Sequence, residues 1–129
     1  VGVLVEMNCE SDFVARTDDF QALLKEIAMH IAAANPVCVN RDAVPVEDLE
    51  REKDIYLAQA KESKKPPNVI DKIVEGKLNS YYSQIVLLDQ PSIRDPKIKI
   101  SDLINTAIAK LGENITISRF SRFKIGEKS

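Results

Sequence analysis

The chain has 129 residues, of which 44% are hydrophobic and only 5% aromatic, so it is long enough for one ordinary domain with a mainly aliphatic core. Its 18 basic and 20 acidic side chains leave a net charge of −2, which argues against the basic surface of a protein that binds nucleic acid or an anionic membrane. No segment approaches the roughly 18 uncharged apolar residues of a membrane-spanning helix.

A strand and a short helical turn are predicted at the start of the chain. Apolar residues alternate over positions 1–7 with a period of two, which is typical of a strand with one apolar face. The polar segment that follows contains Ser11, whose hydroxyl can accept a backbone N–H from two or three residues further on. We therefore expect Ser11 to cap a short helical turn over residues 12–15.

An amphipathic helix is predicted over residues 18–34. Thr17 can cap it, and its apolar side chains follow at spacings of three and four, the repeat of one helix face. Asn35 and Pro36 end the pattern. The β-favouring residues 37–39 then predict a second short strand.

A helical hairpin is predicted over about residues 46–89. Pro45 begins a first helix of residues 46–63, which carries only a thin apolar stripe. Two lysines and two prolines at 64–67 break this helix. A longer helix over about 67–89 presents apolar residues at alternating spacings of four and three, close to a coiled-coil seam. Two helices joined by so short a turn are expected to lie antiparallel.

The last two predicted elements are a helix and a strand. Ser101 is expected to cap the helix, and Gly112 to end it. The strand covers about 115–125, and its apolar residues change parity between Ile117 and Phe120, which predicts a bulge or a strand that leaves the sheet. The complete order predicts one α+β domain, in which a small, mainly antiparallel, three-stranded sheet is covered by helices.

No group of residues in the sequence forms a recognisable catalytic, metal or cofactor site. The single histidine, His30, falls within the amphipathic helix, where a partly exposed or core-edge imidazole is a better interpretation than a general base. Cys9 and Cys38 lack the spacing of a zinc site and are expected to be free thiols. The four glycines are too scattered for a loop that binds phosphate. We therefore expect neither an enzyme nor a bound cofactor or metal.

The C-terminal strand allows one alternative interpretation. It interleaves Arg119 and Arg122 with Phe120 and Phe123, and aromatic and basic side chains on a strand can stack on bases and contact phosphates. However, the chain is net acidic, and no second aromatic strand accompanies this one. A half-buried strand of the sheet therefore fits better, and an RNA- or ribosome-binding module stays the alternative.

Residues 6–16, with the sequence Glu-Met-Asn-Cys-Glu-Ser-Asp-Phe-Val-Ala-Arg, resemble the signature of the elongation factor Ts family. The central residues of that signature are Thr-Asp-Phe-Val, and Ser11 replaces the threonine here while keeping a hydroxyl that can cap the turn. Further segments resemble the second half and the closing helix and strand of the family, in the same order: residues 73–78, 87–91, 110–115 and 119–120. The likeness covers nearly all of the chain.

The resemblance implies a guanine nucleotide exchange factor of translation elongation, which binds elongation factor Tu in its GDP-bound and nucleotide-free states. It further implies that Ser11, Asp12, Phe13 and Val14 bind this partner, with Phe13 entering an apolar slot beside the nucleotide. Side chains near the partner's Mg²⁺ would be displaced, the phosphate site would be disturbed, and GDP would leave. Direct binding of nucleic acid or of a membrane is not expected.

Two departures from the family pattern bear on these expectations. The small helical module with which family members usually begin has no match here, so residues 1–129 are expected to form the core domain without it. The chain is similar to the short single-core forms, some of which pair as homodimers, and a homodimer is therefore a hypothesis. A structural module without exchange activity stays an alternative. The expected location is a bacterial cytoplasm, or the matrix or stroma of an organelle.

Overall fold

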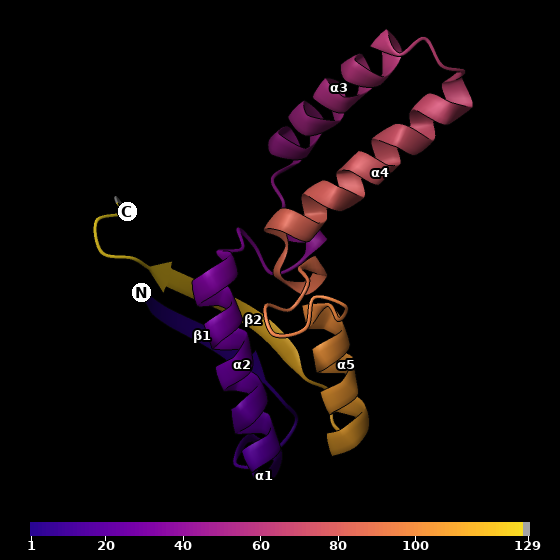
Figure 1. Ribbon diagram of the computed structural model, residues 1–129. Coiled ribbons are helices and arrows are strands. Elements are labelled where there is room, and N and C mark those ends of the chain that lie inside the picture. Colours follow the sequence, from indigo (N-terminus) through magenta and orange to yellow (C-terminus); the bar gives the residue numbers. More distant parts are fainter. Residues whose placement is uncertain (128–129) are drawn as a thin grey trace.

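The structure is a computed structural model that describes residues 1–127. It has an α+β fold, in which helices pack on a small antiparallel sheet and a helical hairpin projects from one end (Figure 1). No described helix is long and apolar enough to cross a membrane. The elements in chain order, with η for a 3-10 helix, are β1 (Gly2–Asn8), α1 (Asp12–Ala15), α2 (Asp18–Ala34), η1 (Arg41–Ala43), α3 (Val46–Glu62), α4 (Pro67–Ile85), η2 (Leu87–Asp89), α5 (Ile100–Leu111) and β2 (Thr116–Phe123).

β1 and β2 form an antiparallel pair whose register shifts at one point. Glu6 lies opposite Arg119 and Met7 opposite Ile117, so Ser118 is an extra residue in β2. Such a bulge brings side chains of opposite parity onto one face of a sheet. The bulge predicted from the change of parity in this strand is therefore confirmed.

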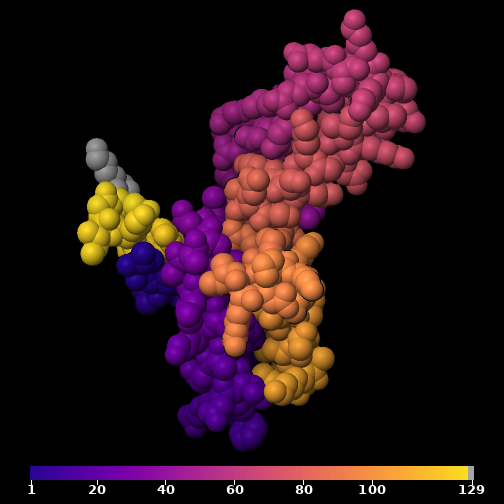
Figure 2. Space-filling view, viewed as in Figure 1, coloured from indigo at the N-terminus to yellow at the C-terminus, as the bar shows by residue number. Residues whose placement is uncertain are grey.

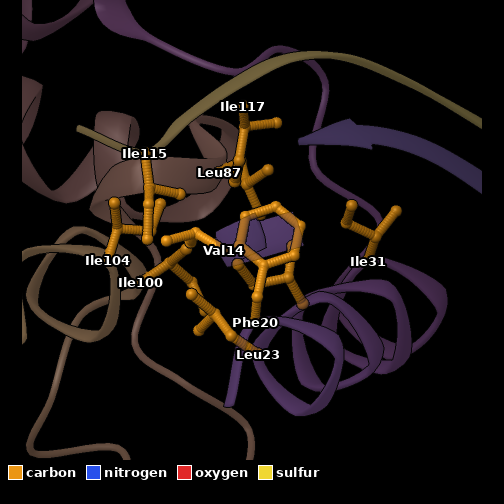
Figure 3. Close-up of a cluster of buried hydrophobic side chains, with 10 residues drawn as sticks. Val14, Phe20, Leu23, Ile31, Leu87, Ile100, Ile104, Ile115 and Ile117 are labelled. Atoms are coloured by element: carbon orange, nitrogen blue, oxygen red, sulfur yellow. The ribbon is translucent and has the colours of Figure 1, made fainter. Parts of the chain in front are cut away.

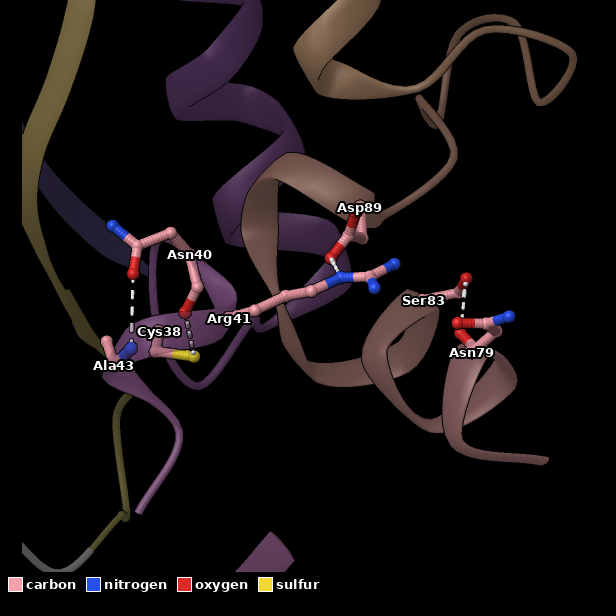
Figure 4. Close-up of polar contacts among 7 residues, drawn as sticks. All are labelled: Cys38, Asn40, Arg41, Ala43, Asn79, Ser83 and Asp89. Carbon is pink, nitrogen blue, oxygen red and sulfur yellow. Dashed lines mark hydrogen bonds and ion pairs between the residues drawn. The ribbon is translucent and has the colours of Figure 1, made fainter. Parts of the chain in front are cut away.

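The sheet has two strands among the described residues, so the third strand predicted at residues 37–39 is wrong. Cys38 forms only an isolated parallel bridge with Val86. The run does not extend further, because the Asn40 side chain accepts the Ala43 N–H at 3.1 Å and starts η1 (Figure 4). The segment therefore joins the base of the helical hairpin instead of the sheet.

The hydrophobic core lies between the sheet, α2 and α5, and Figure 3 shows its central side chains. α2 contributes the face predicted from its spacing, and Ile27 and Ile31 on that face are fully buried. The buried members of the cluster are Val14, Phe20, Leu23, Ile27, Ile31, Leu87, Ile100, Ile104, Ile115 and Ile117. All but Phe20 are aliphatic, as the composition predicts. Burial of each large side chain contributes about 1.5–3 kcal/mol.

α4 is shorter than predicted. It ends at Ile85 instead of continuing to about residue 89, because Val86 has extended backbone dihedrals (φ −97°, ψ 118°) and bridges to Cys38. Residues 87–89 continue as the separate helix η2. The tertiary contact at Val86 therefore overrides the apolar spacing that favoured one longer helix.

The predicted start of α5 is also corrected. The helix begins at Ile100, so Ser101 lies within its first turn instead of capping it. Lys99 holds the cap position, and its N–H donates to the Asp102 carboxylate at 3.0 Å. An acid at the third helical position can satisfy this N–H, so the serine hydroxyl is not needed.

α3 and α4 form an antiparallel hairpin that extends from the domain at the end away from α1 (Figures 1 and 2). Only Ala60 of α3 is buried, in agreement with the thin apolar stripe predicted for that helix. Only Val74 of α4 is buried, although the apolar spacing of this helix predicted a stripe close to a coiled-coil seam. At the base of the hairpin, Arg41 Nε lies 2.8 Å from an Asp89 carboxylate oxygen (Figure 4). The Arg41 guanidinium also lies 4.4 Å from the centre of the Tyr82 ring. These contacts connect the base of α4 to η1 and η2.

Two glycines, one at the end of a helix and one inside a helix, allow a matched test of the backbone conformations. Gly112 has φ 75° at the C-terminus of α5, whereas Gly76 lies inside α4, and a Cβ at either position would meet no atom within 4 Å. Gly112→Ala is expected to lower the free energy of unfolding by about 1–2 kcal/mol through left-handed strain alone. Gly76→Ala is expected to raise it by about 0.5–1 kcal/mol. Urea unfolding measures both changes, and the opposite signs would contradict these backbone assignments.

Candidate partner-binding site

The corner between β1 and α2 carries the residues that the sequence singles out. Ser11 is the N-cap of α1, with extended dihedrals (φ −135°, ψ 153°), and its hydroxyl accepts the Val14 N–H at 3.3 Å. The predicted cap is therefore confirmed. Successive residues of a helix are rotated by about 100° around its axis, so the side chains of residues 12–14 point in different directions.

Phe13 and Val14 face opposite environments. Val14 is 5% exposed and belongs to the core cluster of Figure 3, whereas Phe13 is 80% exposed. Asp12 beside it is exposed as well. A Phe side chain left in water forgoes about 1.5–3 kcal/mol of burial free energy, so the stability of the domain does not explain this placement. Val14 anchors the corner, and Asp12 and Phe13 form its outward surface.

The Glu113 carboxylate joins this corner to the connection between α5 and β2. Its Oε1 accepts the N–H groups of Glu10 at 3.1 Å and of Ser11 at 2.9 Å, and its Oε2 accepts the Ser11 hydroxyl at 2.6 Å. No pattern in the sequence points to this role, because 102 residues separate Glu113 from Ser11. The sequence does show an acidic residue directly after the helix-ending Gly112. This position alone does not indicate which groups the carboxylate would bind.

Further hydrogen bonds hold both ends of α1. Before the turn, the Cys9 thiol donates to the Ser11 carbonyl at 3.2 Å. After it, the Thr17 hydroxyl donates to the Val14 carbonyl at 2.7 Å and accepts the Phe20 N–H at 3.2 Å, which caps α2 as predicted. A helix of 4 residues is too short to be stable by itself. The position of α1 therefore depends on these contacts and on the burial of Val14.

The surface beside Phe13 is an open depression of mixed charge. Its lining residues are Phe13, Arg16, Thr17, Asp18 and Asp19. Asp19 also forms an ion pair with Lys110 of α5 at 3.3 Å. Residues 1–127 contain no group of three or more His, Cys, Asp or Glu side chains that could hold a metal ion. An exposed aromatic group in this setting is suited to binding a partner.

The chain matches one protein family over its described length: the family model described as Elongation factor TS covers residues 1–127. This chain belongs to the elongation factor Ts family. Its sequence is 54% identical over 127 residues to the protein named Elongation factor Ts from Geobacter sulfurreducens, covering 98% of this chain and 59% of that relative.

Two further relatives with the name Elongation factor Ts give the same result. The protein from Herpetosiphon aurantiacus is 53% identical over 126 residues, which cover 98% of this chain and 64% of the relative. The protein from Syntrophus aciditrophicus is 55% identical over 128 residues, which cover 99% of this chain and 64% of the relative. The chain therefore spans about six tenths of the length of the curated relatives it matches.

His30 is buried more completely than predicted. The side chain is 1% exposed, its Nε2 lies 2.9 Å from Gln90 Oε1, and the Ile93 N–H donates to its Nδ1 at 3.3 Å. Because Nδ1 accepts a backbone N–H, Nε2 carries the proton and donates to Gln90. The partly exposed position, one of the two predicted alternatives, is wrong, because Gln90 supplies a buried partner from 60 residues away. A ring so enclosed is out of reach of an external substrate.

The basic and aromatic residues of β2 mostly make contacts within the chain itself. Arg122 donates to the Ala32 carbonyl at 3.2 and 3.1 Å, and its side chain is 12% exposed. Phe120 packs against the core, and Arg119 forms an ion pair with β1 at 3.3 Å. Phe123 is the member of this set with an exposed ring. One exposed ring does not form a stacking surface, so the structure favours the half-buried strand over an RNA-binding strand.

The two cysteines, Cys9 and Cys38, are free thiols, as predicted. Burial raises the pKa of the Cys38 thiol, and the negative charge of Asp89 raises it further. A raised pKa lowers the thiolate fraction at neutral pH, and the thiolate is the reactive form of cysteine. Cys38 is therefore a weak nucleophile at the base of the helical hairpin.

Proposed function

We propose that this chain promotes the release of GDP from elongation factor Tu, with the Phe13 corner as the surface that acts on the partner. The observation that carries the proposal is the placement of Phe13, which is 80% exposed on a corner that Val14 and Glu113 hold in position. An aromatic side chain on a fixed support has little freedom to lose on binding. Exposed aromatic anchors of this kind dominate the binding free energy of many interfaces.

The proposed contact is the insertion of Phe13 into an apolar slot of the partner's G domain. Asp12 and Ser11 hold the turn at the entrance of the slot, and Val14 supports it from the core. Insertion displaces side chains near the Mg²⁺ of elongation factor Tu and disturbs its phosphate site. Mg²⁺ and the phosphate contacts hold the nucleotide in such proteins, so their loss weakens the binding of GDP. The factor itself forms and breaks no covalent bond.

Thermodynamic linkage sets the size of the effect that the factor and GDP have on each other's binding. The factor weakens GDP binding by the same ratio by which GDP weakens the binding of the factor. Exchange therefore passes through a ternary complex with GDP and a nucleotide-free binary complex, and GTP then displaces the factor. The proposed site of action is translation elongation in a bacterial cytoplasm, or in the matrix or stroma of an organelle.

A fluorescent-GDP release assay with elongation factor Tu tests the proposal. The chain is expected to accelerate GDP release when present at a small fraction of the elongation factor Tu concentration, because each copy acts repeatedly. Binding of the nucleotide-free partner without acceleration of release would favour a structural module instead. A steeply salt-dependent affinity for RNA together with no acceleration would favour the RNA-binding alternative.

A further inference from the structure

We propose that Glu113 is a positioning residue that sets the orientation of Phe13 through the backbone of the corner. Three hydrogen bonds converge on its carboxylate, from the Glu10 N–H, the Ser11 N–H and the Ser11 hydroxyl, at 3.1, 2.9 and 2.6 Å. Hydrogen bonds to an ionised acceptor are shorter and stronger than those to a neutral one. The effect of Glu113 on exchange rests on the proposed function, whereas its effect on the corner does not.

The two amides that Glu113 accepts lie where regular structure cannot supply acceptors. Glu10 and Ser11 follow the end of β1 at Asn8 and precede the start of α1 at Asp12. Their N–H groups therefore lie outside both the sheet ladder and the helix, and Glu113 Oε1 is their acceptor. The same carboxylate also holds the hydroxyl that caps α1, so the entry to the turn and the capped Val14 N–H depend on one side chain.

The fold brings Glu113 to this position from the far end of the chain. Asn8 at the end of β1 pairs with Thr116 at the start of β2, which places the connection from α5 beside the corner. Gly112 ends α5 with φ 75° before Glu113, and Ile115 after it is 2% exposed in the core. The carboxylate therefore lies on a connection that is fixed at both ends. Through its hydrogen bonds, the position of the Phe13 corner depends on the positions of α5 and β2.

Replacement of Glu113 by Gln in the full chain tests this role. Gln keeps the size and one acceptor oxygen but loses the charge, and its NH₂ group cannot accept the Ser11 hydroxyl. Hydrogen exchange of the Glu10 and Ser11 amides, followed by NMR in the free chain, is expected to become about tenfold faster. Exchange of the Ile27 amide in the core is expected to stay unchanged. Acceleration of GDP release at low factor concentration is expected to fall by about tenfold as well.

Glu10→Gln is the matched control, because it removes the same charge from the same corner while its side chain is exposed and Glu113 keeps its hydrogen bonds. It is expected to leave both the amide protection and GDP release within about twofold of the unmutated chain. Ser11→Ala removes one of the three bonds and is expected to have an intermediate effect. If Glu113→Gln does not fold, Ser11→Ala takes its place in both measurements.

Two results would overturn the role of Glu113. Unchanged protection of the Glu10 and Ser11 amides in Glu113→Gln would show that the carboxylate does not hold the corner. An equal loss of GDP release in Glu10→Gln would assign the effect to charge instead of position. If the unmutated chain does not release GDP, the proposed function fails, and the amide measurement alone then decides whether Glu113 orients the turn.

Discussion

Phe13→Ala is expected to lose most of the GDP-release activity, by about thirtyfold, while the domain keeps its fold. A desolvated aromatic anchor is worth about 2 kcal/mol, which corresponds to that factor in rate when the contact forms only in the complex that releases GDP. Because the side chain is 80% exposed in the free chain, its removal takes away no core contact. Fluorescent-GDP release measures the loss, and circular dichroism melting checks the fold.

Phe123→Ala is the control for this prediction. Phe123 is also a phenylalanine on the surface, 62% exposed, but it lies at the end of β2 that pairs with Gly2, far along the sheet from α1. GDP release by this variant is expected to stay within about twofold of the unmutated chain. Release by Phe13→Ala as fast as by the unmutated chain would refute the role of Phe13. An equal loss in both variants would assign the effect to general surface hydrophobicity.

His30→Ala is expected to cause the largest loss of stability, about 3 kcal/mol in the free energy of unfolding. The substitution leaves Gln90 Oε1 and the Ile93 N–H without their partner in a region where the side chains of His30 and Gln90 are 1% and 3% exposed. A buried polar group without a partner costs about 1–3 kcal/mol, and the cavity left by the ring adds to this. Urea unfolding followed by circular dichroism measures the change.

Met29→Ala is the matched control for His30→Ala, because Met29 is the preceding residue of α2 and is 58% exposed. Its substitution is expected to change the free energy of unfolding by no more than about 0.5 kcal/mol. A loss below about 1 kcal/mol in His30→Ala would mean that the hydrogen bonds of the imidazole do not hold Gln90 and the segment after η2 to α2.

Local features of this protein follow from the sequence because they arise between residues that are close along the chain. The caps at Ser11 and Thr17 satisfy N–H groups three residues further on, and the left-handed Gly112 ends its own helix. The change of parity between Ile117 and Phe120 likewise contains the bulge. Capping and periodicity act over four residues or fewer, so one sequence is enough to predict them.

Features that depend on contacts between distant residues arise only when the separate elements pack together. The β-favouring residues 37–39 contact the base of the hairpin instead of β1, so the third strand did not form. His30 became buried because Gln90 supplies a partner from 60 residues away, and Glu113 reaches Ser11 from a distance of 102 residues. Such contacts arise only when separate elements pack together, and no periodicity encodes them.

The different environments of Phe13 and Val14 show the same contrast between local sequence and tertiary packing in two adjacent residues. Local capping predicts that one short turn holds both side chains after the first strand. It did not determine which side chain enters the core, because both are apolar and local spacing is equally consistent with either. The packing of α1 against α2 and the sheet placed Val14 inside and Phe13 in solvent, since a helical turn cannot direct two successive side chains to the same side.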